Sequence, residues 1–534
     1  MTNPASSIIG FPARVVSRHD HINKTIRLAD PKTTSTEILM NLITLHPPEI
    51  SAHEVLFRWD ISPPSALYHR NQFTLRFPSS LDLSAVPESL WWQVALICLH
   101  SQWSLLRPCR VRLPFKLRPG EAEVWCRLLD AAVMTLEAYR RTSDFDRQIE
   151  IVDDGPLLDD KKLVETDRCA TAFSGGKDSL LQVGLLTELT ARPVLVAVTS
   201  PMPPLEDHLT PRRRQILREI VKRRDVELIE VESDYRANFD HGFAQSLGYM
   251  ISVNELTDTF LYFGALLAAG AASGATHLFL ASEAEVQENI SLDGRLIQHS
   301  HFMYSTITQR VLQALLRRWG LSYSSLTSPL HSAQVQELVW TRYRDLRDLQ
   351  YSCWRVRGNN SVCNECPQCL RIAFAALALG DKPSLIGVDL VKLLSSQRDW
   401  KPRSLSKIAS PVLPNDLISC HLHAQTLRTI EATSLAGIIK EIISSRPKQL
   451  LTSQAVTALR TYRGLRRLAV ERKNGGAPGY RPGFLKLLDP LLRERVGAIF
   501  AEHFQTETQS AYADILARGD GLTSWILAPI GGEQ

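Results

Sequence analysis

The middle third of the chain constrains the fold most, because short apolar runs alternate there with segments of helical periodicity. The runs at 168–173, 193–199, 226–231 and 277–281 are typical of buried strands, and helices are expected from Ser179 and over 209–223, 256–272 and 307–319. Strands that alternate with helices predict an α/β fold in which a parallel sheet is covered on both faces. Ligands of such sheets lie at the carboxyl ends of the strands, so chemistry is expected in the turns that follow them.

The segments on either side have a different character. Residues 1–165 combine expected strands at 53–61, 71–77 and 109–115 with helices over 87–106 and 120–140, which predicts an N-terminal α+β accessory domain. Residues 401–534 are helical in their periodicity, with helices expected over 424–445, 453–470, 483–503 and 506–518. We therefore predict three parts, 1–165, 166–400 and 401–534, which agrees with the domain count expected for 534 residues.

The composition is that of a globular protein and excludes several other classes. Hydrophobic residues make up 44% and charged residues 22%, which argues against a disordered or fibrous chain. A net charge of +5 is too small for a dedicated nucleic-acid coat. The apolar stretch 260–275 is short for a membrane span and leads into an expected strand, so a buried helix is predicted. The first 16 residues show no signal-peptide pattern, and we expect a cytoplasmic protein without membrane contact.

The most informative turn follows the first expected strand of the middle third. It consists of Ser174, Gly175, Gly176, Lys177, Asp178 and Ser179. Two glycines let the backbone turn tightly and approach a ligand, and the free amides of the following helix then face one anionic group. The serine hydroxyls add donors, Lys177 can add charge, and Asp178 would orient the loop or hold a magnesium ion. These features predict a phosphate or pyrophosphate site, with a purely structural glycine turn as the alternative.

Two common phosphate motifs do not fit this turn. Walker A needs a glycine six residues before its lysine and a Ser or Thr directly after it, where this chain has Thr171 and Asp178. The Rossmann fingerprint also fails. The remaining pattern, S-G-G-x-D-S, resembles the PP-loop of the ATP pyrophosphatase superfamily, whose members cleave ATP between the α and β phosphates and form an adenylate. The resemblance implies ATP binding by residues 174–179 and catalytic roles for Lys177, Asp178 and Ser179.

Four of the nine cysteines lie within 17 residues of one another, at Cys353, Cys363, Cys366 and Cys369. Four thiolates complete a tetrahedral zinc shell with no open position, so the pattern predicts a structural zinc site. An iron–sulfur cluster is the alternative, because thiolates hold both kinds of centre.

The PP-loop and the C-x9-C-x2-C-x2-C pattern together are similar to one family, the 7-cyano-7-deazaguanine synthases (QueC). The similarity extends over about residues 168–380 and includes the run from 328–330 through 351–354, which leads into the first cysteine, Cys353. It implies an adenine nucleotide α-hydrolase-like sheet, ATP, Mg²⁺ and Zn²⁺ as cofactors, and 7-carboxy-7-deazaguanine as substrate. ATP would activate the carboxylate as an acyl-adenylate, and an amine would displace AMP. In the synthase this amine is ammonia, and a second ATP dehydrates the amide to the nitrile.

The chain is far longer than such a synthase, because about 165 residues precede the similar segment and about 150 follow it. In this it resembles the enlarged QueC-like proteins of bacterial antiphage operons, either CBASS-associated or Qat-type, in which the activated carboxylate passes to the N-terminal amine of a partner protein. This implies an ATP-dependent carbon–nitrogen ligase with a protein partner encoded nearby and no nucleic-acid partner. The alternatives are a 7-cyano-7-deazaguanine (preQ0) synthase that uses ammonia, a tRNA-modifying PP-loop enzyme and a non-catalytic nucleotide-binding scaffold.

Several other residues are weaker candidates. Asn254 and Glu255 lie where a substrate-facing loop is expected, and Glu283 follows the fourth expected strand. The basic stretches 212–214, 222–224 and 463–467 are expected to be charged helix faces rather than RNA-binding patches. Ordinary loop or core positions, rather than a second metal site, are expected for His301, Cys420, His421 and His423.

Overall fold

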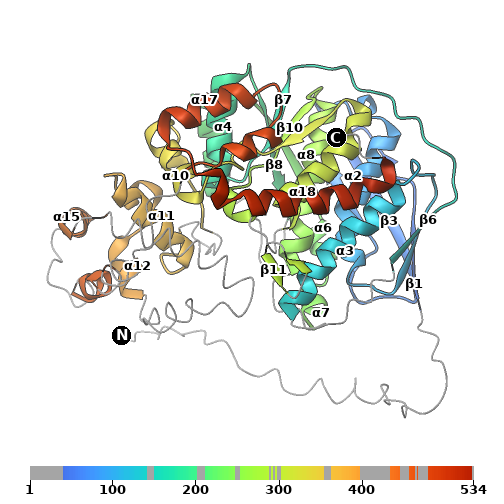
Figure 1. The fold of residues 1–534 in the computed structure, drawn as a ribbon, viewed down its shortest axis with the longest axis horizontal. Coiled ribbons are helices and arrows are strands. Elements are labelled where there is room, and N and C mark those ends of the chain that lie inside the picture. Colours follow the sequence, from blue (N-terminus) through green and yellow to red (C-terminus); the bar gives the residue numbers. More distant parts are fainter. Residues whose placement is uncertain are drawn as a thin grey trace, which may run out of the picture. The chain divides into compact units, whose positions relative to one another are not determined.

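The computed structural model of the protein describes residues 40–140, 149–200, 211–246, 253–287, 290–292, 295–297, 302–353, 362–396, 433, 435–445, 456–463, 466 and 479–531. An eleven-stranded sheet is the centre of this part of the chain (Figure 1). Ten strands follow one another in the order β13-β10-β7-β8-β9-β4-β3-β1-β5-β6, and β2 pairs with β3. The α/β fold expected from the sequence is confirmed at this level.

The middle third supplies the parallel half of the sheet. Its strands are β7 (Cys169–Ala172), β8 (Val194–Thr199), β9 (Glu227–Ser233), β10 (His277–Phe279) and β13 (Ser322–Ser324). All four neighbouring pairs among them are parallel. Four of these strands, β7, β8, β9 and β10, lie where the sequence predicts them. The apolar runs of β7 and β8 are buried on both faces of the sheet, whereas β9 alternates buried residues with the exposed Glu230 and Glu232.

The N-terminal third extends the same sheet. Its strands are β1 (Asn41–Leu45), β2 (Glu49–Ile50), β3 (Glu54–Ser62), β4 (Gln72–Arg76), β5 (Cys109–Leu113) and β6 (Ile149–Asp153). The connection between the two halves is the antiparallel pair β4–β9, in which Leu75 faces Ser233 and Arg76 faces Glu232. The predicted part boundaries at 165 and 400 stay predictions, but hydrogen bonding in the sheet crosses the first of them.

Helices cover both faces of the sheet, as the sequence predicts. Alternate residues of β8 belong to different cores: Val196 lies in the core that contains residues of α2, α3, α8 and α9, whereas Leu195 lies in the core that contains residues of α4, α5, α10 and α11. The first group is α2 (Glu88–Trp103), α3 (Glu121–Arg140), α8 (Val253–Ala272) and α9 (Thr306–Leu316). The second is α4 (Lys177–Leu189), α5 (Pro211–Arg223), α10 (Ser332–Thr341) and α11 (Pro367–Ala378). From Phe260 onward α8 is almost entirely buried, which confirms the buried helix expected there.

Shorter elements complete the described part of the middle third. They are the helices α6 (Tyr235–Asn238), α7 (His241–Ser246) and α12 (Leu390–Ser396), and a two-stranded hairpin of β11 (Ile290–Leu292) and β12 (Arg295–Ile297).

The C-terminal part is helical, although its boundaries differ from those expected. The described helices are α15 (Leu435–Ser445), residues 456–463, α17 (Arg493–His503) and α18 (Ala513–Leu527). The predicted continuous helix over 483–503 is wrong, because a 3-10 turn (Pro482–Leu487) and a break at Asp489-Pro490 precede α17. The predicted helix over 506–518 is displaced, since α18 begins at Ala513 and continues through Gly519 and Gly521 to Leu527.

A buried aspartate connects this C-terminal part to the sheet by hydrogen bonds. Asp489 Oδ2 lies 2.8 Å from His277 Nδ1 at the start of β10 and also accepts a hydrogen bond from Ser322 at the start of β13. The Asp489 amide donates to Ser324 Oγ over 3.2 Å. The C-terminal part is therefore attached to the starts of β10 and β13 and to the end of β13.

Candidate functional site

The glycine-rich turn connects β7 to α4, as the sequence predicts. Gly175 has φ of +82°, a left-handed conformation that other residues adopt only with strain. A Cβ built on Gly175 would find nothing closer than 3.8 Å, so the requirement for glycine is conformational. Gly176 is the N-cap of α4 and provides no side-chain cap, which leaves the start of the helix suited to an anion.

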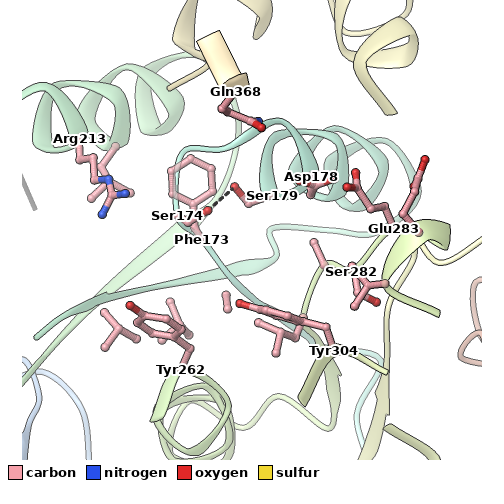
Figure 2. A pocket seen from close by; sticks show the side chains of 18 of the residues that line it. Phe173, Ser174, Asp178, Ser179, Arg213, Tyr262, Ser282, Glu283, Tyr304 and Gln368 are labelled. Carbon is pink, nitrogen blue, oxygen red and sulfur yellow. Dashed lines mark hydrogen bonds between the residues drawn. The ribbon is translucent and has the colours of Figure 1, made fainter. Parts of the chain in front are cut away.

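Both predicted serines lie at this turn and interact with each other. Ser174 Oγ is 3.3 Å from Ser179 Oγ, and Ser179 Oγ donates to the Gly176 carbonyl over 3.0 Å (Figure 2). The Gly176 amide lies 3.4 Å from Ser174 Oγ. The two hydroxyls therefore stabilise the conformation of the turn. Ser174 and Ser179 also line one cavity of the protein.

The segment before the first cysteine supports the turn from the other side. The Tyr351 amide donates to the Gly175 carbonyl over 2.8 Å, and the Lys177 amide donates to Ser352 Oγ over 3.3 Å. Cys353, the first member of the cysteine cluster, follows directly. The turn and the cluster are therefore in contact, although some 175 residues separate them in sequence.

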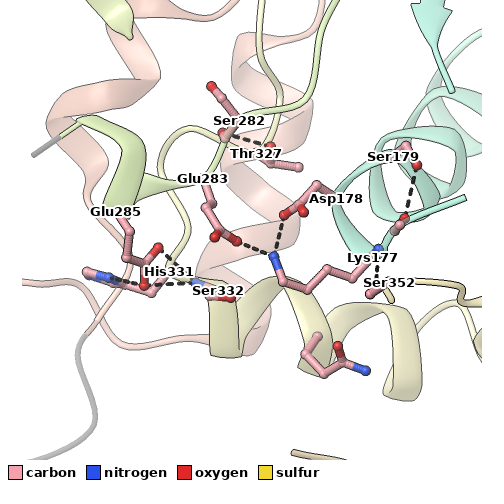
Figure 3. Close-up of polar contacts among 12 residues, drawn as sticks. Lys177, Asp178, Ser179, Ser282, Glu283, Glu285, Thr327, His331, Ser332 and Ser352 are labelled. Atoms are coloured by element: carbon pink, nitrogen blue, oxygen red, sulfur yellow. Dashed lines mark hydrogen bonds and ion pairs between the residues drawn. The ribbon is translucent and has the colours of Figure 1, made fainter. Parts of the chain in front are cut away.

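Lys177 is buried and faces two carboxylates (Figure 3). Its Nζ donates to Asp178 Oδ1 over 2.6 Å and also to Glu283 Oε2, in the turn after β10. Burial opposes the charged form of Lys177, but the two carboxylates outweigh it and raise the pKa of the ammonium group. Burial and the neighbouring Asp178 carboxylate raise the pKa of Glu283, and the attraction of Lys177 opposes this shift. Lys177 therefore organises the carboxylates of the site, and Asp178 remains one-third exposed beside the cavity.

A second polar group lies beside the first and involves the C-terminal part. Glu285 accepts two hydrogen bonds from the Ser332 amide, at 3.1 and 3.0 Å, and lies 3.3 Å from His331 Nδ1. On the other side of the ring, His331 Nε2 is 3.3 Å from Glu507 Oε2, which also accepts a 2.9 Å bond from Arg481 Nε. Burial disfavours the charged ring, yet the two glutamates raise the pKa of His331 to about 9. Residues far from the central motif thus hold a carboxylate that borders the cavity.

A cavity of about 400 Å³ opens at the carboxyl ends of β7, β8 and β10. The predicted residues Ser174, Asp178 and Ser179 line it. The polar and aromatic lining that the sequence did not indicate consists of Arg213, Tyr262, Ser282, Tyr304, Gln368 and Arg371 (Figure 2). Tyr262 and Tyr304 lie across the cavity from the glycine turn. Arg213 belongs to the basic stretch 212–214, which was expected to be a charged helix face, and Gln368 and Arg371 lie close to Cys369 in sequence.

The four predicted cysteines come together in one buried cluster. Their Sγ atoms all lie within 4.8 Å of one another, with 3.5 Å between Cys366 and Cys369 and 3.8 Å between Cys363 and Cys369. Four sulfurs at about 2.3 Å from one tetrahedral ion would be about 3.8 Å apart. The Cys363 amide donates to Cys353 Sγ and the Cys369 amide to Cys366 Sγ, bonds that stabilise thiolates. The cluster can therefore hold a metal ion such as zinc, and its spacing leaves little room for several iron atoms between the sulfurs.

The other candidates of the sequence are only partly covered. The described structure includes the backbone of Asn254 and Glu255 in α8 but not their side chains, while His301 and residues 420–423 lie outside the described residues. In the basic stretches, Arg223 and Arg224 pair with Asp348 and Asp345 over 2.7 and 2.6 Å. These two arginines thus have partners within the chain.

Comparisons with protein-family models, curated proteins and solved structures found no match to this chain. Among the described residues, no helix combines the length and apolar character that crossing a membrane requires.

Proposed function

We propose that this protein is an ATP-dependent carbon–nitrogen ligase that activates a carboxylate as an acyl-adenylate. One observation carries the proposal: the turn of residues 174–179, with a left-handed Gly175 and an N-cap that provides no side chain, opens into a cavity at the ends of parallel strands. Amides at the start of a helix, together with hydroxyls, suit a pyrophosphate group. The full S-G-G-x-D-S pattern favours ATP over other phosphate ligands.

The reaction begins with attack of a carboxylate oxygen on the α-phosphorus of ATP. The bond between that phosphorus and the oxygen bridging to the β-phosphate breaks, and pyrophosphate leaves. An amine then attacks the acyl carbon, loses a proton, and expels AMP as the new C–N bond forms. Since a carboxylate is already a nucleophile, the protein mainly positions it and stabilises charge on the leaving group.

The residues of the turn have different roles in this reaction. Ser174, Ser179 and the amides at the start of α4 would bind oxygens of the leaving pyrophosphate. The Asp178 carboxylate is one-third exposed and suits an oxygen-preferring cation, and bound magnesium would neutralise phosphate charge. Lys177 keeps Asp178 and Glu283 in place rather than reaching the phosphate itself.

The substrate in this proposal is 7-carboxy-7-deazaguanine or a close analogue, which follows from the resemblance to the QueC family. The cavity is consistent with it, since Phe173, Tyr262 and Tyr304 offer rings for stacking on a planar heterocycle. The acceptor amine is the N-terminus of a partner protein in antiphage defence, because the extra segments provide surface that ammonia would not require.

Two alanine variants test the nucleotide part of the proposal. Ser179→Ala and Asp178→Ala should each lower the release of AMP and pyrophosphate at least about 100-fold. Thr187→Ala, a hydroxyl removed from the far end of the same helix, should retain the wild-type rate. Wild-type turnover in the first two variants would refute the assignment.

Intact-protein mass spectrometry tests the acceptor. The protein is incubated with ATP, magnesium, 7-carboxy-7-deazaguanine and the proteins encoded beside it. A mass gain on one neighbour, equal to the deazaguanine acyl group, is the expected result. Free nitrile formed from ammonia without a protein adduct would contradict conjugation while leaving adenylation intact.

A further inference from the structure

The cysteine cluster contacts the cavity through both of its flanking segments. Before the cluster, Tyr351 and Ser352 hydrogen-bond to the glycine turn. At the other end of the cluster, Cys366 is the N-cap of α11, and its Sγ accepts a hydrogen bond from the Cys369 amide over 3.4 Å. The first turns of α11 then bring Gln368 and Arg371 to the cavity wall. A cluster that fixes Cys353 and Cys366 therefore fixes two walls of one cavity.

Arg371 differs from the other charged groups of the cavity in its partners. Among the described residues, its Nη2 donates a hydrogen bond to Gln368 Oε1, and no carboxylate pairs with it. The cavity carboxylates are engaged elsewhere, Asp178 and Glu283 by Lys177 and Glu285 by His331 and the Ser332 amide. The described protein thus places a cation at the cavity wall without a matching anion.

We infer that Arg371, oriented by Gln368, binds phosphate oxygens of a pyrophosphate group held at the glycine turn. Gln368 and Arg371 line the same cavity as Ser174 and Ser179, and Figure 2 draws Gln368 on the side of the cavity that holds the glycine turn, opposite Tyr262 and Tyr304. A guanidinium presents paired N–H donors that match two phosphate oxygens, and the hydrogen bond to Gln368 limits its freedom. The inference rests on the proposed function and adds to it a residue that binds the leaving group.

The inference also gives the cysteine cluster a role beyond local folding. Four thiolates around one ion would hold Cys366, and with it the first turn of α11, against the segment that supports the glycine turn. Loss of the ion should therefore weaken pyrophosphate binding through displacement of Arg371, even though no cysteine touches the ligand.

Calorimetric titration of the full chain with magnesium pyrophosphate, and separately with AMP, tests the inference. Arg371→Gln should weaken pyrophosphate binding at least about tenfold and leave AMP binding unchanged, because hydrogen bonds to charged groups are the strong ones. Arg371→Lys should bind pyrophosphate with intermediate affinity, since it keeps the charge and loses the paired donors. Arg218→Gln, an exposed arginine of α5 outside the cavity, should bind both ligands like the wild type.

Melting temperature and bound zinc are measured on the same samples, so that misfolding is recognised. Unchanged pyrophosphate affinity in both Arg371 variants would overturn the inference and leave the proposed function standing. Equal losses of pyrophosphate and AMP binding that accompany loss of zinc in both variants would also overturn the inference. A wild-type protein that binds neither ATP nor pyrophosphate would overturn the proposed function as well.

Discussion

Replacing His331 tests how the C-terminal part supports the cavity. The imidazole lies between Glu285 and Glu507, 3.3 Å from each, and only 5% of the residue is exposed. Although burial and the nearby Arg481 oppose its charge, the two glutamates raise the pKa of His331 to about 9. In the unfolded chain the same group returns to its ordinary value of about 6.5.

The size and sign of the effect follow from this difference. A gap from about 6.5 to about 9, at 1.36 kcal/mol for each pH unit, corresponds to about 3 kcal/mol of folding stability. A group whose pKa is raised by folding contributes all of this below about pH 6.5, where both states are protonated. The contribution is lost as the pH rises through about 9, where the folded protein also releases the proton.

Urea unfolding of the full chain, followed by tryptophan fluorescence, measures this contribution at pH 6 and pH 9.5. His331→Gln should be less stable than the wild type at pH 6, and this deficit should shrink by about 3 kcal/mol at pH 9.5. His46→Gln, which removes an exposed histidine paired with Asp60, should show little change between the two pH values. A His331→Gln deficit that stays constant between pH 6 and pH 9.5 would show that the charge of His331 does not contribute this stability.

Two further predictions concern packing and the metal site. Gly184→Ala should destabilise the protein by about 1–3 kcal/mol in urea unfolding, because the new Cβ would lie 2.6 Å from the Tyr343 ring. The control is Gly274→Ala, whose new Cβ would meet no atom within 4 Å. Its positive φ alone should lower the free energy of unfolding by about 1–2 kcal/mol. A smaller loss for Gly184→Ala than for Gly274→Ala would contradict a steric clash at Gly184. Metal analysis of the purified protein should find about one zinc ion per chain, lost in Cys369→Ser and retained in Cys126→Ser, together with a lower melting temperature for Cys369→Ser alone. An iron-rich, coloured preparation, or zinc retained in Cys369→Ser, would contradict the zinc assignment.

The features predicted correctly from the sequence are local ones. The tight turn at Gly175 could be predicted from six adjacent residues between a short apolar run and a helix. The cysteine cluster could be predicted because its four members lie within 17 residues of one another in sequence. Strands β7 and β8 could be predicted because each is a short, continuous run of apolar residues buried on both faces of the sheet. Such a run lacks the 3.6-residue spacing of apolar positions that indicates an amphipathic helix.

The features that were not predicted depend on distant contacts. Nothing near Lys177 in the sequence indicates that its ammonium faces Glu283, more than 100 residues away. Pairing of β4 with β9 joins two segments by a short antiparallel register that no local pattern specifies. In the C-terminal part, Pro490 interrupts a helical period, and packing on α9 carries α18 through two glycines.

We propose that this chain cleaves ATP between its α and β phosphates, and the fate of the α-phosphate tests this proposal directly. ATP labelled at the α-phosphate is incubated with the protein, magnesium, 7-carboxy-7-deazaguanine and an amine, and the labelled products are separated. All released label is expected in AMP or in an adenylate that converts to AMP, with pyrophosphate formed in equal amount. Label in ADP, or ATP that remains intact under every combination of carboxylate and amine, would contradict the account.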